Sequence, residues 1–205
     1  MPEFDLNALT GADGVWTIWV LPVLLGLGLA SATGLRTFLP LLMLAGAARF
    51  GLFGIDLNET MAWLTSDAAI LALGIAAVVE FTGDKIPVVD NALSTLGLIT
   101  RPVAGAVAAG SVFAGVDPTT AAVAGVIIGA PTALAFNAAQ GGARLTSTTT
   151  TGGLGNPVLS FIEDILAVFT VILAFLAPIL VPVLLIVLAV VVFRLARRLR
   201  TPRPA

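Results

Sequence analysis

The sequence predicts an all-α fold, a polytopic transmembrane helical bundle with about seven membrane segments in a single domain. Residues 165–193 contain no charged side chain, an acidic pair precedes them and five arginines follow. Hydrophobic residues make up 58% of the chain, charged residues 11%, and the mean hydropathy is +1.06. Because a soluble chain of 205 residues has no core large enough for such a block, we expect it to lie in lipid.

Hydrophobic stretches bounded by charges or by Gly, Pro and Thr predict the individual segments. They lie near residues 15–33, 36–54, 62–84, 100–116, 118–140, 157–177 and 178–198. Only a short Gly-containing stretch separates the first two, so a re-entrant hairpin is the alternative to two spans. A continuous helix over 157–198 would be about 60 Å long, so a break is predicted at Pro178 and Pro182.

The domain organisation predicted from these segments is one integral membrane domain over residues 1–205. It comprises an acidic N-terminal segment (1–14), the helical bundle (15–198) and a basic C-terminal tail (199–205). Because Lys and Arg are retained in the cytoplasm, the arginine-rich end is predicted inside and the N-terminus outside. Counting spans then places Arg36, Lys85, Arg101 and Arg144 inside, whereas Arg49 falls on the outer side and does not follow the rule. The tail is interpreted as a stop-transfer flank, with no nucleic-acid partner.

A weak internal repeat relates residues 37–49 to residues 132–144. The two stretches align without gaps, and Thr, Leu, Gly, Ala and Arg coincide. They run in opposite directions in the predicted topology, as in transporters built from inverted repeats. The alternative is a chance match in a chain of low diversity, and the acidic residues do not support the repeat, because Glu80 ends its helix whereas Glu163 begins its own.

The absence of His and Cys restricts the chemistry. Disulfides, thiolate or imidazole metal ligands, and Ser-His or Cys-His catalysis are excluded. We therefore assign no catalytic residue and expect no cofactor, and the sequence leaves open whether a metal binds. Any chemistry would depend on carboxylates, Arg, Lys, hydroxyls and amides.

Charged residues predicted near the cytoplasmic side form the main candidate site. An unpaired charge in lipid costs about 2.5–3.5 kcal/mol on insertion scales, so these groups should face one another or a hydrated cavity. They could simply pair to hold the helices together, or they could form a vestibule in which Glu80 or Glu163 carries a proton. The candidates are Glu80, Asp84, Lys85, Asp90, Arg101, Glu163 and Asp164, with Arg36 and Arg144 beside them.

The stretch from residue 146 to residue 157 is the second candidate, because it combines hydroxyls and glycines with an Asn-Pro helix start. Its backbone N–H groups could form an anion-binding nest around Thr151, Gly152, Gly153 and Asn156, and the alternative is a polar turn. Asn137 and Gln140 lie one turn apart within a helix. They could either bond across helices or line a path.

Four stretches carry a resemblance to a known family. They are residues 33–41, Glu80 with residues 84–90, residues 101–105, and residues 151–157 leading to Ser160, Glu163 and Asp164. On these stretches the chain resembles a family of small bacterial integral membrane proteins, the domain of unknown function DUF4126. The resemblance implies a membrane location and an intact, single-domain architecture, and it supplies no activity. We expect a multi-pass protein of the bacterial inner membrane. The family has a His and a Lys where this chain has Asn137 and Gln140, which weakens any mechanism with a basic or titrating group there.

Three functional hypotheses follow. The first is a transporter-like or channel-like protein whose acids bind an ion or proton, and whose arginines and loop amides hold an anionic small molecule or lipid headgroup. The second is a membrane enzyme in which carboxylates hold Mg²⁺ against a lipid phosphate, although no repeated Asp-rich motif is present. The third is a structural subunit. Besides the bilayer, a homo-oligomer is allowed by small-residue faces such as Gly26 with Ala30.

Overall fold

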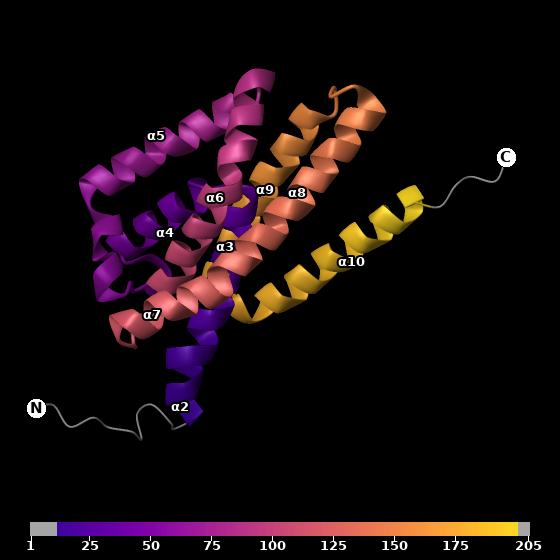
Figure 1. The fold of residues 1–205 in the computed structure, drawn as a ribbon. Helices are drawn as coiled ribbons and strands as arrows, with labels where there is room; N and C mark the ends of the chain where they lie inside the picture. Colours follow the sequence, from indigo (N-terminus) through magenta and orange to yellow (C-terminus); the bar gives the residue numbers. More distant parts are fainter. Residues whose placement is uncertain (1–11, 201–205) are drawn as a thin grey trace, which may run out of the picture.

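The computed structural model describes residues 12–200, without the side chains of residues 12, 13, 87, 88, 91, 92, 192, 195, 196 and 198–200. Most of the predicted acidic segment and of the basic tail lies outside the described residues. All regular elements in the described part are helical, which confirms the predicted all-α class. Figure 1 shows them as a bundle, with α2 and the end of α10 at opposite ends.

The elements follow one another with short connections. In chain order they are α2 (Ala12–Val15), η1 (Trp16–Val20), α3 (Leu21–Leu35), α4 (Leu39–Arg49), η2 (Leu52–Gly54), η3 (Glu59–Thr65), α5 (Asp67–Gly83), α6 (Pro87–Ser111), α7 (Pro118–Ala124), η4 (Gly125–Gly129), α8 (Ala130–Thr151), α9 (Asn156–Leu176), η5 (Pro178–Leu180) and α10 (Val181–Arg200). η1 and η4 are π-helical turns, and each joins its neighbours into a longer helix.

Local sequence signals explain where these helices begin. Proline occupies the first or second position of α4, α6, α7 and α9, where its missing N–H costs nothing. The side chain of Ser66 accepts a hydrogen bond from the N–H of Ala69 at the start of α5, and Asp117 caps α7 in the same way. The predicted break before α10 occurs at Ala177 and Pro178.

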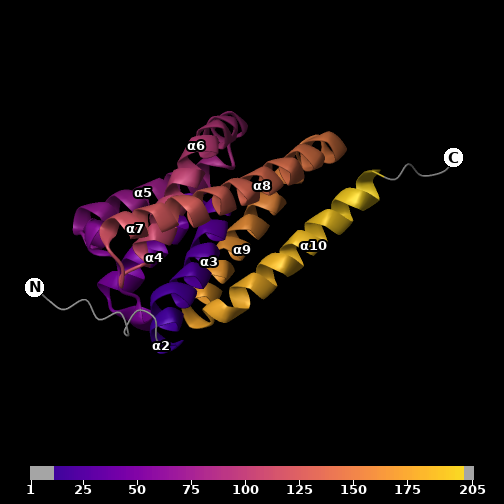
Figure 2. The same ribbon diagram turned by 60° about the horizontal axis from the view of Figure 1, so that its bottom comes forward.

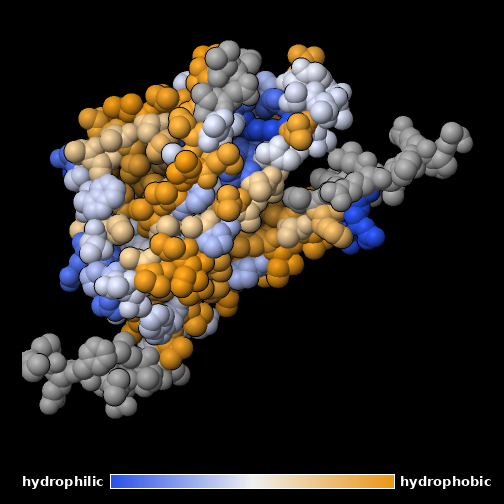
Figure 3. Space-filling model, viewed as in Figure 1, coloured by the Kyte–Doolittle hydropathy of each residue, from blue (hydrophilic) through white to orange (hydrophobic). Residues whose placement is uncertain are grey.

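Four described helices are long and apolar enough to cross a membrane, which indicates a lipid environment. They are Trp16–Leu35, Leu93–Ser111, Pro118–Thr151 and Asn156–Leu176. A fifth span results if Glu59–Thr65 and Asp67–Gly83, which are bent by 66° relative to each other, are taken together. In Figure 3 large areas of the visible surface are hydrophobic, as expected for helices that face lipid.

The predicted count of about seven spans is not confirmed. Each predicted segment contains helix, but α4 has 11 residues, about 16 Å, and its apolar stretch is too short to cross the hydrocarbon core. The apolar part of α10, Pro178–Val191, is also short. Residues 87–99, which lie between the predicted segments 62–84 and 100–116, form the first half of α6.

Helix α3 forms the centre of the bundle and packs against α6, α8 and α9 (Figures 1 and 2). Small residues allow this close packing. A Cβ atom on Gly26 would lie 3.2 Å from that of Ala109, and one on Gly129 would overlap the backbone of Gly105. The small-residue faces identified in the sequence are therefore used within the chain.

Candidate functional site

The candidate site lies where the backbone is interrupted between α3 and α4. Arg36 has an extended conformation (φ −137°, ψ 120°) and ends α3. The amides of Thr37 and Phe38 then donate hydrogen bonds to the two carboxylate oxygens of Glu80, at 2.9 and 3.2 Å. Glu80 lies near the end of α5 and is only 5% exposed. A negative charge is favourable here because the start of α4 carries the positive end of its helix dipole.

Arg36 links α3 to α5 and α9 from a position that is 2% exposed. Its Nη1 forms an ion pair with Asp84, and its Nη2 donates to the hydroxyl of Ser160 at 2.7 Å and to the carbonyl oxygen of Ser160 at 3.1 Å. Its Nε lies 2.6 Å from Asp164 Oδ1 but has no hydrogen bond of acceptable geometry. The arginine therefore holds two acidic residues from different helices.

Arg144 of α8 makes the second set of ion pairs. Its guanidinium contacts Glu163 at 2.7 Å, Asp90 at 2.5 Å and Asp84 at 3.3 Å. These acids come from α9, the first turn of α6 and the end of α5. Because Asp84 also pairs with Arg36, the two arginines share one carboxylate at the middle of the cluster.

Arg101 of α6 differs from the other two arginines. It is 6% exposed, and no ion pair joins it to a carboxylate in the described part of the chain. Its Nη1 donates to the carbonyl oxygen of Gly34 at 3.1 Å, to Asn137 Oδ1 at 2.7 Å and to Gln140 Oε1. Gln140 in turn donates to Glu163 at 2.5 Å. Asn137 and Gln140 thus bond across helices, one of the two roles considered for them.

We refer to this set of residues as the charged cluster. It brings together three positive and five negative side chains, a formal surplus of two negative charges. Its members are Arg36, Arg101 and Arg144, and Glu80, Asp84, Asp90, Glu163 and Asp164. Figure 3 shows hydrophilic residues in a recess between the first turns of α6 and the last turns of α8.

Lys85 is not part of the charged cluster, although it was predicted beside Asp84. Its side chain is exposed, and its Nζ lies 3.7 Å from the centroid of the Phe81 ring. This cation–π contact holds the ammonium on the outer face of α5. Conversely, Ser160 was missing from the predicted site residues, and Gln140 was considered only for a bond across helices or for lining a path. Ser160 lies one turn before Asp164 on α9, and this spacing could have identified it.

The Thr- and Gly-rich stretch does not contribute contacts to the charged cluster. Helix α8 continues to Thr151, and the connection to α9 is a turn in which Gly152 and Gly153 have positive φ. The N–H of Gly155 donates to the Thr151 hydroxyl at 3.0 Å, and Asn156 Nδ2 donates to Thr148. The N–H groups of Leu154 and Asn156 are bonded within the same turn. An anion nest would have to displace these bonds.

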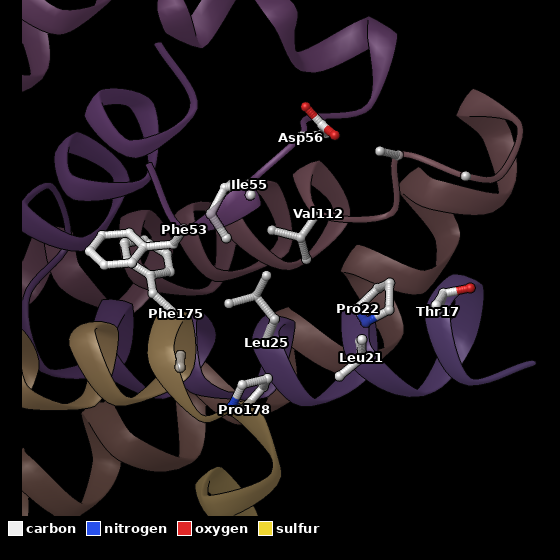
Figure 4. Close-up of a pocket in the computed structure, with 14 residues that line it drawn as sticks. Thr17, Leu21, Pro22, Leu25, Phe53, Ile55, Asp56, Val112, Phe175 and Pro178 are labelled. Carbon is white, nitrogen blue, oxygen red and sulfur yellow. The ribbon is translucent and has the colours of Figure 1, made fainter. Parts of the chain in front are cut away.

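A separate cavity of about 420 Å³ lies among the opposite ends of the helices (Figure 4). Its lining is largely apolar and includes Leu25 and the stacked rings of Phe53 and Phe175, with Asp56 and Thr17 at its edge. No predicted site residue lines it. We therefore place the candidate site at the charged cluster.

Comparisons with known proteins agree with the resemblance noted in the sequence. No curated protein and no solved structure matches the chain. A family model, the domain of unknown function DUF4126, matches residues 23–198. This range contains every residue of the charged cluster and extends from α3 into α10. The chain therefore belongs to the DUF4126 family.

Proposed function

We propose that the protein is a transporter-like or channel-like protein of the bacterial inner membrane, in which the charged cluster binds a proton or another ion. The observation that carries the proposal is the surplus of two negative charges among largely buried side chains. Uncompensated charge is unfavourable at low dielectric, so a proton or a bound cation would lower the free energy of the charged cluster.

The distribution of partners suggests where the added positive charge would bind. Glu80 has two amide donors and no ion pair with an arginine in the described structure. Arg144 is divided among three carboxylates, so Asp90 and Glu163 each have only a share of its charge. Carboxylates with incomplete compensation are the expected proton or cation acceptors.

Access to the charged cluster also supports a transport role. A cavity of about 460 Å³ between α6 and α8 is lined in part by Arg101 and Arg144, and another of about 270 Å³ is lined in part by Arg36, Glu80 and Asp164. The helix interruption at α3–α4 resembles the discontinuous helices at which transporters bind ions. The inverted repeat over residues 37–49 and 132–144 remains a prediction.

The competing structural role rests on a different observation. Arg36 and Arg144 have most of their donors satisfied by acids and by Ser160, so the charged cluster could serve to lock α3, α5, α8 and α9 together. An enzymatic role with Mg²⁺ is less favoured. Within residues 12–200, where side chains are described, no group of three or more carboxylates is placed to hold a metal ion.

Charge displacement on a solid-supported membrane separates ion binding from a structural role. Proteoliposomes would receive a rapid jump in proton or Na⁺ concentration, and a transient current would report binding without knowledge of a substrate. We expect the current to be lost in Glu163→Gln and retained in the matched control Asp67→Asn. Asp67 is 91% exposed and pairs only with Arg49 among described residues. Equal currents in the two variants, or none in the folded wild-type protein, would refute ion binding.

The proposed orientation places the charged cluster and the C-terminus in the cytoplasm and the N-terminus outside. The absence of cysteine allows a direct test with single introduced thiols. Leu154→Cys in the exposed turn after α8 should react only with a reagent on the cytoplasmic side, and Glu59→Cys only with one outside. The reverse labelling pattern would invert the topology.

A further inference from the structure

We propose that the cavity between α6 and α8 binds the oxyanion group of a small organic phosphate or carboxylate, with Arg101 as its main anchor. The inference rests on the proposed function, because the proton or cation taken up by the carboxylates would offset the negative charge that an oxyanion adds beside the charged cluster. A soluble ion and a lipid headgroup share this chemistry, and the experiment below distinguishes them.

The lining of this cavity has the polarity of an anion site. Its described residues include two guanidinium groups, Arg101 and Arg144, together with the polar side chains of Ser94, Asn137 and Gln140. No carboxylate is among the described lining residues. The acids that pair with Arg144 thus lie outside the described lining of this cavity. Guanidinium, hydroxyl and amide groups are the donors that phosphate and carboxylate oxygens accept from.

Arg101 is the residue in this lining whose charge is least compensated. Its partners are neutral oxygens of Gly34, Asn137 and Gln140, and all three contact Nη1. Its Nε is buried and has no hydrogen-bond partner. A guanidinium that is 6% exposed would be expected to pair with an anion, because burial of a lone charge is costly. An oxyanion in the adjoining cavity would supply that partner.

Gly97 keeps the space beside this guanidinium open. A Cβ atom at this position would lie 3.1 Å from Arg101 Nε. A larger residue one turn before Arg101 would therefore press on the nitrogen that lacks a partner. Gln140 separates Arg101 from Glu163, since its oxygen accepts from the arginine and its nitrogen donates to the acid. This arrangement leaves Arg101 free of a permanent carboxylate partner.

The size of the cavity argues for an organic ligand. Its volume of about 460 Å³ exceeds what a bare phosphate ion would fill, and Leu98 and Ala138 provide apolar wall. The oxyanion would bind at Arg101, near the Arg144 guanidinium, and the remainder of the ligand would contact the apolar wall. This arrangement is typical of small-molecule sites, where a few polar groups fix the orientation.

Ligand-induced thermal stabilisation tests the proposal with the full chain in nanodiscs. One arm uses neutral phosphatidylcholine nanodiscs with added inorganic phosphate or acetate, and the other replaces part of the lipid with phosphatidylglycerol. A ligand that binds the folded state and not the unfolded state raises the melting temperature by an amount that grows with the ratio of its free concentration to its Kd. We expect stabilisation in wild type and in Arg49→Gln, and a reduction in affinity of about tenfold or more in Arg101→Met.

A second variant covers the case in which Arg101→Met does not fold. Ser94→Trp would fill the cavity from its exposed rim, and we expect it to abolish stabilisation as well. A shift with phosphate or acetate assigns the site to a soluble anion, and a shift with phosphatidylglycerol alone assigns it to a lipid headgroup. No shift in either arm, or equal shifts in wild type and both cavity variants, would overturn the oxyanion site. Ion-jump currents that persisted in that case would leave the proposed function intact.

Discussion

Removal of the Glu80 carboxylate tests whether this side chain holds the start of α4. In Glu80→Ala, the amides of Thr37 and Phe38 lose their acceptors in a buried position. A hydrogen bond to a charged acceptor contributes about 1.5–3 kcal/mol, so the two bonds together correspond to about 3–6 kcal/mol. Relief of repulsion from neighbouring carboxylates offsets part of this loss, and we expect a net destabilisation of about 3 kcal/mol.

The assay is thermal unfolding of the purified protein in detergent, followed by circular dichroism. For a chain of this length, 1 kcal/mol corresponds to about 2–4 °C, so the melting temperature should fall by about 6–12 °C. Glu80→Gln should lose about half as much, because its carboxamide retains one acceptor oxygen. Asp67→Ala removes an exposed ion pair and should change stability by less than about 1 kcal/mol. If Glu80→Ala were no more destabilising than Asp67→Ala, the role assigned to Glu80 would be wrong.

Three further variants probe the packing and the caps by thermal unfolding. Gly129→Ala would drive a methyl group into the backbone of α6 and should destabilise the protein by about 1–3 kcal/mol or more. Gly46→Ala, where the added methyl group meets no atom within 4 Å, should be neutral or slightly stabilising. Equal changes in melting temperature for the two variants would contradict the packing described for Gly129. Asn58→Ala removes two hydrogen bonds from Asn58 Nδ2 to the carbonyl oxygens of Phe113 and Val116 in the loop after α6. It should cost about 2–3 kcal/mol, so an unchanged melting temperature would count against these bonds. The Thr120 hydroxyl donates to Asp117 and holds the pKa of Asp117 below its ordinary value. The stability lost in Asp117→Ala should therefore be constant at neutral pH and shrink as the pH falls through that lowered pKa. A stability difference between wild type and Asp117→Ala that grew on acidification would refute the cap.

The helical membrane class and the approximate positions of the segments follow directly from hydropathy and charge. The span count does not, because hydropathy records apolar length and cannot show where a helix stops inside the bundle. The segment predicted over residues 36–54 ends as α4 at Arg49, and Gly51 and Gly54 with positive φ form the following turns. Only tertiary contacts, such as those of Glu80 with the start of α4, make so short a helix stable.

The grouping of charges at the candidate site could be predicted from the sequence, because an unpaired charge in lipid is costly and must pair with another charge or face water. Side-chain direction was less predictable. Lys85 adjoins Asp84, but an aromatic ring one turn earlier draws it outward. The threonines before Gly152 were expected in a loop, yet the hydroxyls of Thr150 and Thr151 donate to carbonyls one turn earlier and allow α8 to continue. Neither outcome follows from local propensity alone.

The π-helical turn η4 allows the number of residues in its helix to change by one without rotating the side chains that follow. Such a turn accommodates one residue more than regular α-helix, and each residue added or removed elsewhere would rotate the following segment by about 100°. Deletion of the outward-facing Ile127 would thus leave Arg144 directed at α9, whereas deletion of Leu134 would swing it away from Glu163. A one-residue deletion at η4 can therefore preserve the same set of ion pairs.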